Sequence, residues 1–190
     1  MSSTRIGILV FTAAALAGPW YTVEEYSPVS NVISQLAAQN TSNSFIMAAG
    51  FLALGIGIVV DGVSRFSKPT IPFIAFGLFM GLAGLLAHKP ISPDVGFNEF
   101  IHQAHSSLAT LAGISITVGL LWQAALLSTF RLRAMTISLA LLCLILPLCM
   151  LAFQDIQGLI QRIMYLFVFV WLWVYYPLML QTSKKLEVIP

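Results

Sequence analysis

Polar side chains that could bind a metal ion or transfer protons gather in one stretch of this chain. All three histidines lie there with two carboxylates, between two long apolar segments: His88, Asp94, Glu99, His102 and His105. Imidazoles three residues apart, such as His102 and His105, share a helix face and can supply ligands to a transition metal. We therefore predict that His88, His102 and His105 bind zinc or another transition metal. Asp94 and Glu99 are the expected further ligand or general base.

A second polar segment, residues 27–36, follows the first apolar run. Ser27 and Pro28 suit the start of a helix, and the apolar residues after them fall on one face. We expect a short amphipathic helix that lies at the membrane interface or dips back into the protein. On it, Ser34 is the candidate catalytic hydroxyl and Ser30 a candidate substrate-binding residue. The alternative is a surface helix that only seals the loop.

A third polar segment opens the last apolar run. Gln157 and Gln161 recur near helical spacing, and Arg162 lies about one turn inside the run. A guanidinium at that depth needs an acidic partner or a way to reach the interface. We predict that Gln157, Gln161 and Arg162 bind a substrate headgroup; an ion pair that pins the last helix is the alternative. The carboxylates expected as partners are Asp94, Glu99 and Asp155.

These polar segments interrupt a chain that is otherwise built for lipid. Of the 190 residues 58% are hydrophobic and only 8% charged, and the mean hydropathy is +0.91. A soluble domain carries about 25% charged residues, so the chain is a polytopic membrane protein. The small net charge of +2 gives no indication of nucleic-acid binding.

Six apolar runs predict an all-α bundle of six membrane-spanning helices in a single domain, 1–190, with a short interfacial helix after the first span. The spans are expected at about 5–20, 44–64, 70–88, 103–127, 133–153 and 158–181. Gly77 and Gly81 form a GxxxG pair, which predicts a close helix contact. Pro147 should kink the fifth span because it removes one backbone hydrogen bond.

Basic residues set the expected orientation. All Lys and Arg except Lys89 and Arg162 fall on one side of the six spans. The positive-inside rule places that side, with both termini, in the cytoplasm. The histidine stretch and the two other polar segments then face outward from a cell membrane, most simply a prokaryotic inner membrane.

The motifs together resemble a prokaryotic membrane-protein family known as domain of unknown function 998. The resemblance rests on Ser-x-x-Ile-Ser-x-Leu at residues 30–36, a histidine before the fourth span (His102) and Gly-x-x-Gln-Arg at residues 158–162. Ala37 stands where family members have glycine. The resemblance covers nearly the whole chain and implies six spans, but it implies no activity.

Several functions fit these residues. One is a metal-dependent hydrolase that acts on a membrane lipid or another amphiphile, with Ser34 polarising the substrate; a serine nucleophile would instead need a histidine within hydrogen-bonding reach. Another is a non-catalytic protein that binds or transports a lipid or small molecule, or an accessory membrane subunit. The nearly uncharged middles of the spans argue against ion transport. Haem bound between His88 and His105 is a less favoured alternative.

Overall fold

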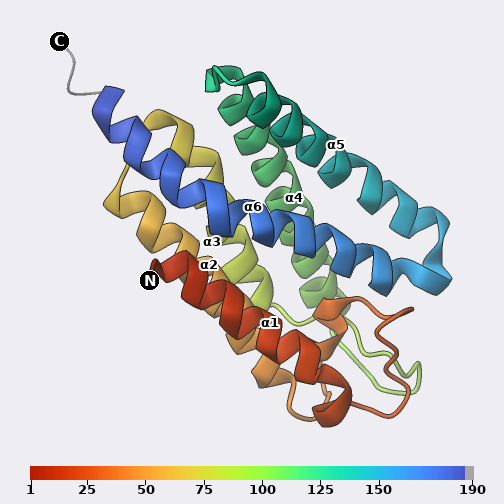
Figure 1. Cartoon of the computed structure of the whole chain (residues 1–190). Helices are drawn as coiled ribbons and strands as arrows, with labels where there is room; N and C mark the ends of the chain where they lie inside the picture. The colour runs from red at the N-terminus through yellow and green to blue at the C-terminus, as the bar shows by residue number, and fades with distance from the viewer. Residues whose placement is uncertain (187–190) are drawn as a thin grey trace.

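The computed structural model of the chain describes residues 1–186, with side chains up to Met179. These residues form six long helices joined by short connections (Figure 1). They are α1 (Ser3–Tyr21), α2 (Ser44–Ser64), α3 (Ile71–Leu85), α4 (Glu99–Leu126), α5 (Phe130–Ala152) and α6 (Gln157–Leu186). Short 3-10 helices occupy three connections: η1 (Ile33–Ala37), η2 (Lys68–Thr70) and η3 (Gln154–Ile156). The predicted all-α bundle is confirmed.

Within the described part of the chain, five helical segments are long and apolar enough to cross a membrane. They are α2, α4, α5, Lys68–Leu85 and Gln154–Met179. The first helix, α1, is not in this group; it carries Arg5 near its start and Pro19 near its end. The class of polytopic membrane protein is confirmed, and a sixth span at α1 stays a prediction.

Close contact between α2 and α3 depends on glycine. A Cβ added to Gly55 would lie 2.5 Å from the carbonyl oxygen of Gly77 and 2.8 Å from Cα of Gly81. The backbones of the two helices therefore touch, as membrane helices do where small residues meet. The contact predicted from Gly77 and Gly81 is confirmed, and Gly55 is its partner.

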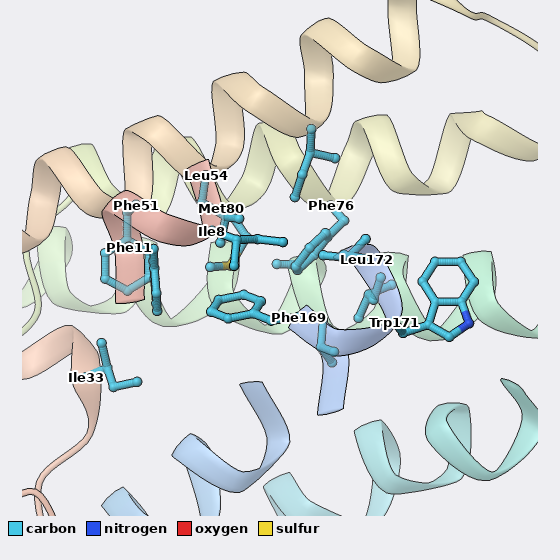
Figure 2. Packing of buried hydrophobic residues seen from close by; sticks show 14 of the residues in the cluster. Ile8, Phe11, Ile33, Phe51, Leu54, Phe76, Met80, Phe169, Trp171 and Leu172 are labelled. Carbon is cyan, nitrogen blue, oxygen red and sulfur yellow. The ribbon is translucent and has the colours of Figure 1, made fainter. Parts of the chain in front are cut away.

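The core of the bundle is aromatic and joins α1, α2, α3 and α6 (Figure 2). The Phe11 ring of α1 meets the edges of Phe51 of α2 at 5.0 Å and of Phe169 of α6 at 5.2 Å. Further along, the Phe73 ring of α3 stacks on Trp171 of α6 at 5.3 Å. In contrast, most of α5 is exposed. This helix therefore borders the bundle rather than filling its centre.

Two polar contacts fix α1 at its N-terminal end. The Asp61 carboxylate of α2 accepts hydrogen bonds from the free N–H groups of Ser3, at 3.2 Å, and Thr4, at 2.8 Å. On the other side, Arg5 donates two hydrogen bonds to the carbonyl of Trp173 at 2.9 and 3.1 Å. That carbonyl lacks its helical partner because Pro177, four residues on, has no N–H. The arginine thus satisfies a backbone group that lipid could not.

The connections segregate between the two ends of the bundle. The 22–43 connection, the 86–98 loop and the α5–α6 turn gather at one end, which we call the loop end (Figure 1). The α2–α3 and α4–α5 connections, with their basic residues, lie at the other. Which end faces the cytoplasm stays a prediction. Two of the basic residues behind it, Lys184 and Lys185, lie outside the described side chains.

Candidate functional site

The segment 26–41 organises the loop end. The predicted short helix is present as η1, but it begins at Ile33 instead of near Pro28. It dips into the bundle: all five of its residues are buried, and Leu36 is completely so. A polar segment at this depth needs partners for its backbone groups. Those partners come from α6 on one side and from the 86–98 loop on the other.

The start of α6 holds segment 26–41 through the Gly-x-x-Gln-Arg motif. Arg162 Nη1 donates to the carbonyls of Pro28 at 2.7 Å and Asn31 at 3.1 Å, and Nη2 donates to the Tyr26 hydroxyl. The Gln161 side chain accepts from the N–H of Ile33 at 2.6 Å. Partners of Arg162 are thus backbone carbonyls and a phenol. The predicted carboxylate partners are wrong: within the described residues, none bonds to Arg162.

Glycine allows this approach. Gly158 contacts the backbone around Asn31 so closely that an added Cβ would lie 2.8 Å from the carbonyl oxygen of Pro28. The N–H of Leu159 donates to the carbonyl of Val29 at 2.9 Å. Burial raises the pKa of the Tyr26 phenol, against the opposing effect of Arg162. The motif therefore serves to join two distant parts of the chain.

The other side of segment 26–41 is held by amide side chains. Gln39 accepts a hydrogen bond from the N–H of Asn98 at 2.8 Å and donates to the carbonyls of Ala87 and Asn98. Its own N–H donates to the carbonyl of His88 at 2.8 Å. Asn40 adds a bond to the carbonyl of Gly96 at 2.7 Å. The histidine-bearing loop is thereby positioned against the segment that carries Ser34.

His105 has a defined hydrogen-bonding state. Its ring is only 3% exposed, and Nδ1 lies 2.8 Å from the carbonyl oxygen of Ala83 and 2.7 Å from that of Leu86. Both carbonyls lie at the C-terminal end of α3, where helical partners run out. Carbonyls only accept, so Nδ1 carries the proton. The neutral ring then presents a lone pair at Nε2.

The other two imidazoles pack beside it. The ring centroid of His88 is 5.3 Å from that of His105 and 4.5 Å from that of His102. Nδ1 of His88 lies 2.9 Å from the carbonyl oxygen of Lys89, which again assigns it a proton. Burial lowers the pKa of His88 to about 4, with smaller contributions from the two neighbouring histidines. The His88 imidazole is therefore neutral at physiological pH.

A cavity of about 530 Å³ lies between α3, α4, α5 and α6. Most of its polar residues lie toward the loop end: Ser34, His88, His105, Ser106 and Gln161. Thr110 and the Tyr165 hydroxyl lie deeper, on α4 and α6. Beyond them the wall is apolar, from Met80 and Ile116 to Val168 and, on α5, Leu144 and Pro147. The cavity thus has one hydrogen-bonding end and one hydrocarbon end.

The predicted site residues divide between this cavity and its surroundings. Ser34, His88, His105 and Gln161 line it, whereas Ser30 and Gln157 do not. His102 contacts the His88 ring from outside. Asp94 is exposed in the loop, and Glu99 is exposed and accepts a hydrogen bond from Gln103.

Arg162 lines a separate groove of about 450 Å³ between α1 and α6, which we call the α1–α6 groove. Apart from Arg162 and Thr12, the residues along this groove are apolar or aromatic, including Phe11, Leu166 and Trp173. The Arg162 guanidinium is already bonded to three carbonyls and the Tyr26 hydroxyl. The groove therefore offers hydrocarbon contacts but little polar recognition.

Sequence reasoning missed part of the cavity. Tyr165 lies on its wall, and its hydroxyl is 3.9 Å from the sulfur of Met80. Both residues belong to apolar runs, so no local pattern distinguished them from lipid-facing residues. Tyr165 lies one helical turn from Gln161 on α6, and Met80 lies one turn from Ala83 on α3. This helical spacing is the signal that could have indicated that both face the cavity.

The metal hypothesis gains no support from the positions of these side chains. Among the described residues, no group of three or more His, Cys, Asp or Glu side chains is arranged to hold an ion. No hydrogen bond joins Ser34 to a histidine within the same residues, as a serine nucleophile would need.

A family model matches residues 5–176, almost the whole chain. The chain belongs to the family described as protein of unknown function DUF998. The predicted resemblance is confirmed. No curated protein and no solved structure matches the chain significantly. Membership of the DUF998 family agrees with the helical bundle and leaves the function to be inferred from the cavity.

Proposed function

We propose that this protein binds an amphiphile, a membrane lipid or a similar molecule, in the cavity between α3, α4, α5 and α6. The observation that carries the proposal is the cavity's division into a hydrogen-bonding end and an apolar end. A headgroup would contact Ser34, His88, His105 and Gln161, and an acyl chain would run along α4 and α6. The volume of about 530 Å³ lies within the range of roughly 300–1,000 Å³ usual for ligand pockets.

Exposed lining residues support entry from the membrane. Thr110, Ile114 and Leu151 line the cavity and are exposed at the protein surface. They lie on α4 and α5, two helices long and apolar enough to span a bilayer. An amphiphile could therefore enter sideways from lipid between these helices. No aqueous path through the bundle is required.

Exposed aromatic rings support the expected depth of the headgroup. Trp20, Phe45, Phe100 and Phe153 are each more than half exposed, and each lies near a helix terminus at the loop end. Aromatic side chains concentrate at membrane interfaces. The hydrogen-bonding end of the cavity is then level with lipid headgroups.

Hydrolysis of the amphiphile, with or without zinc, would be a further step that no contact among the described residues favours. We therefore propose binding of the amphiphile and no reaction. It differs from the metal-dependent hydrolase expected from residue types alone, because it uses atoms that are free in the structure.

A cavity-filling substitution tests the proposal. Gly113 lines the cavity, and a Cβ added there meets nothing within 4 Å. Gly113→Trp should therefore occupy the cavity without disturbing the fold. Leu111→Trp, on the same helix but outside the cavity, is the matched control.

The measurement is mass spectrometry of lipids that remain with protein extracted in mild detergent. The wild type and Leu111→Trp should retain a stoichiometric amphiphile, and Gly113→Trp should lose at least nine-tenths of it. Equal retention by all three proteins, each folded by circular dichroism, would contradict the proposal.

A further inference from the structure

The polar atoms at the loop end of the cavity indicate what kind of headgroup it can take. Two imidazoles present acceptors there: with Nδ1 of His105 and of His88 bonded to carbonyls, the lone pair of each neutral ring is at Nε2. A ligand that brings a donor, such as a hydroxyl, can therefore bond to an acceptor that the described residues leave without a hydrogen bond.

The remaining polar groups complement an oxygen-rich ligand. The Gln161 carbonyl oxygen is occupied by the N–H of Ile33, which leaves its NH2 group as a donor. The Ser34 side chain is 7% exposed, and its hydroxyl makes no hydrogen bond to the described residues. That hydroxyl can donate to an ester or ether oxygen, or accept from a second hydroxyl.

Charge is missing from the cavity wall. Among the described residues that line it, none is Asp, Glu, Lys or Arg. Arg162 is committed to backbone carbonyls in the α1–α6 groove, and Lys89 is exposed outside the cavity. A phosphate or carboxylate placed at the polar end would be buried without a counter-charge, which is costly.

We propose that the ligand has an uncharged headgroup with at least one free hydroxyl, as in glycerol esters and long-chain alcohols. The hydroxyl donates to Nε2 of His105, and Ser34 and Gln161 contact the ester or further hydroxyl oxygens. This inference rests on the proposed function, because it names the class of amphiphile that the same cavity binds. His105 is then a binding residue whose orientation is fixed by the end of α3.

Four single-chain probes that share an oleoyl chain test the inference in phosphatidylcholine nanodiscs, by native mass spectrometry. They are monooleoylglycerol, methyl oleate, oleate and oleoyl lysophosphatidic acid. We expect monooleoylglycerol to bind at least ten-fold more tightly than methyl oleate, which lacks the hydroxyl, and than the two anionic probes.

Two variants report on the contacts. His105→Asn keeps a donor for the α3 carbonyls and removes the Nε2 acceptor, so it should abolish the ten-fold preference. Ser34→Ala leaves no described partner unpaired and should weaken monooleoylglycerol binding several-fold, which covers the case in which the histidine variant does not fold. Gly113→Trp is the control for binding within the cavity.

The outcomes separate the two proposals. Suppose that Gly113→Trp still blocks binding. Then tighter binding of oleate or lysophosphatidic acid, or equal binding of monooleoylglycerol and methyl oleate, would overturn the inference of an uncharged headgroup with a hydroxyl and leave the amphiphile cavity standing. Binding that ignores Gly113→Trp for every probe would overturn the amphiphile cavity itself, and the inference with it.

Discussion

Two hollows of similar size lie side by side along α6. They differ in whether their polar atoms already have hydrogen-bond partners. The α1–α6 groove, about 450 Å³, holds the most strongly polar residue of the region, Arg162. The cavity between α3, α4, α5 and α6, about 530 Å³, holds only neutral polar groups. Yet the arginine is bonded to three backbone carbonyls and the Tyr26 hydroxyl, whereas Ser34 and Nε2 of His105 have no partner among the described residues.

The difference shows that the type of a residue is a poor guide to its availability. A guanidinium bonded to backbone carbonyls stabilises the fold, and a neutral hydroxyl without a partner can recognise a ligand. We therefore assign a structural role to the α1–α6 groove's Arg162 and a binding role to the cavity.

The largest effect should follow from Arg162→Leu. It removes the hydrogen bonds to Pro28, Asn31 and Tyr26 that hold segment 26–41 against α6. We expect a loss of roughly 2–4 kcal/mol in the free energy of unfolding. The measurement is denaturant or thermal unfolding in detergent, with Arg133→Leu at the opposite end as control, because Arg133 bonds only near its own helix start. An unchanged stability with altered lipid retention would reverse the roles given to the two hollows.

Acid should destabilise the polar end of the cavity, where His88 lies. The pKa of His88 is lowered to about 4, so between pH 6.5 and 4 the unfolded chain binds a proton that the folded protein excludes. Stability is therefore complete above pH 6.5 and falls toward pH 4, by up to about 3 kcal/mol. His88→Phe keeps a ring against its neighbours and removes the titration. Its melting temperature should fall less between pH 7 and pH 4 than that of the wild type; parallel curves would contradict the assignment.

Two glycine substitutions sharpen the contrast. Gly158→Ala places a methyl group against the fixed backbone near Pro28 and Asn31 and should destabilise the protein by roughly 1–3 kcal/mol. Gly113→Ala places the same methyl group in the open cavity and should be neutral or stabilise α4 by up to about 1 kcal/mol. If thermal unfolding shows that both variants lose a similar amount of stability, the space beside Gly113 is not open and the cavity is contradicted.

The smallest effect on stability belongs to the residue with the clearest ligand role. Ser34→Ala removes a hydroxyl without a described partner and should change the free energy of unfolding by no more than about 0.5 kcal/mol. A larger loss, measured by the same unfolding assay, would mean that Ser34 supports the fold.

Local patterns predicted the helices well, because apolar runs long enough to span a membrane leave few alternatives. The expected span at 44–64 coincides with α2. The helix expected from Ser27 and Pro28 does not start there, because the carbonyls of residues 28, 29 and 31 bond to α6 rather than to their own turn. Such tertiary hydrogen bonds are invisible in the segment's own sequence.

The site was harder to predict than the fold. Spacing groups Glu99 with His102 on one face of α4, but it does not indicate how that helix is rotated. The structure turns His105 inward because the end of α3 offers it two unpaired carbonyls. With His105 turned inward, the predicted ligand His102 on the same helix lies beside the cavity. Arg162, on α6, lines the α1–α6 groove instead.

The most direct test of the central claim is photo-crosslinking with a monoacylglycerol that carries a diazirine in its acyl chain, followed by peptide mapping. The account predicts labels on the cavity wall, within residues 109–116 of α4 and 143–151 of α5, and their loss in Gly113→Trp. Labels confined to residues 8–16 of α1 and 166–174 of α6, unaffected by Gly113→Trp, would place the amphiphile in the α1–α6 groove and contradict the account.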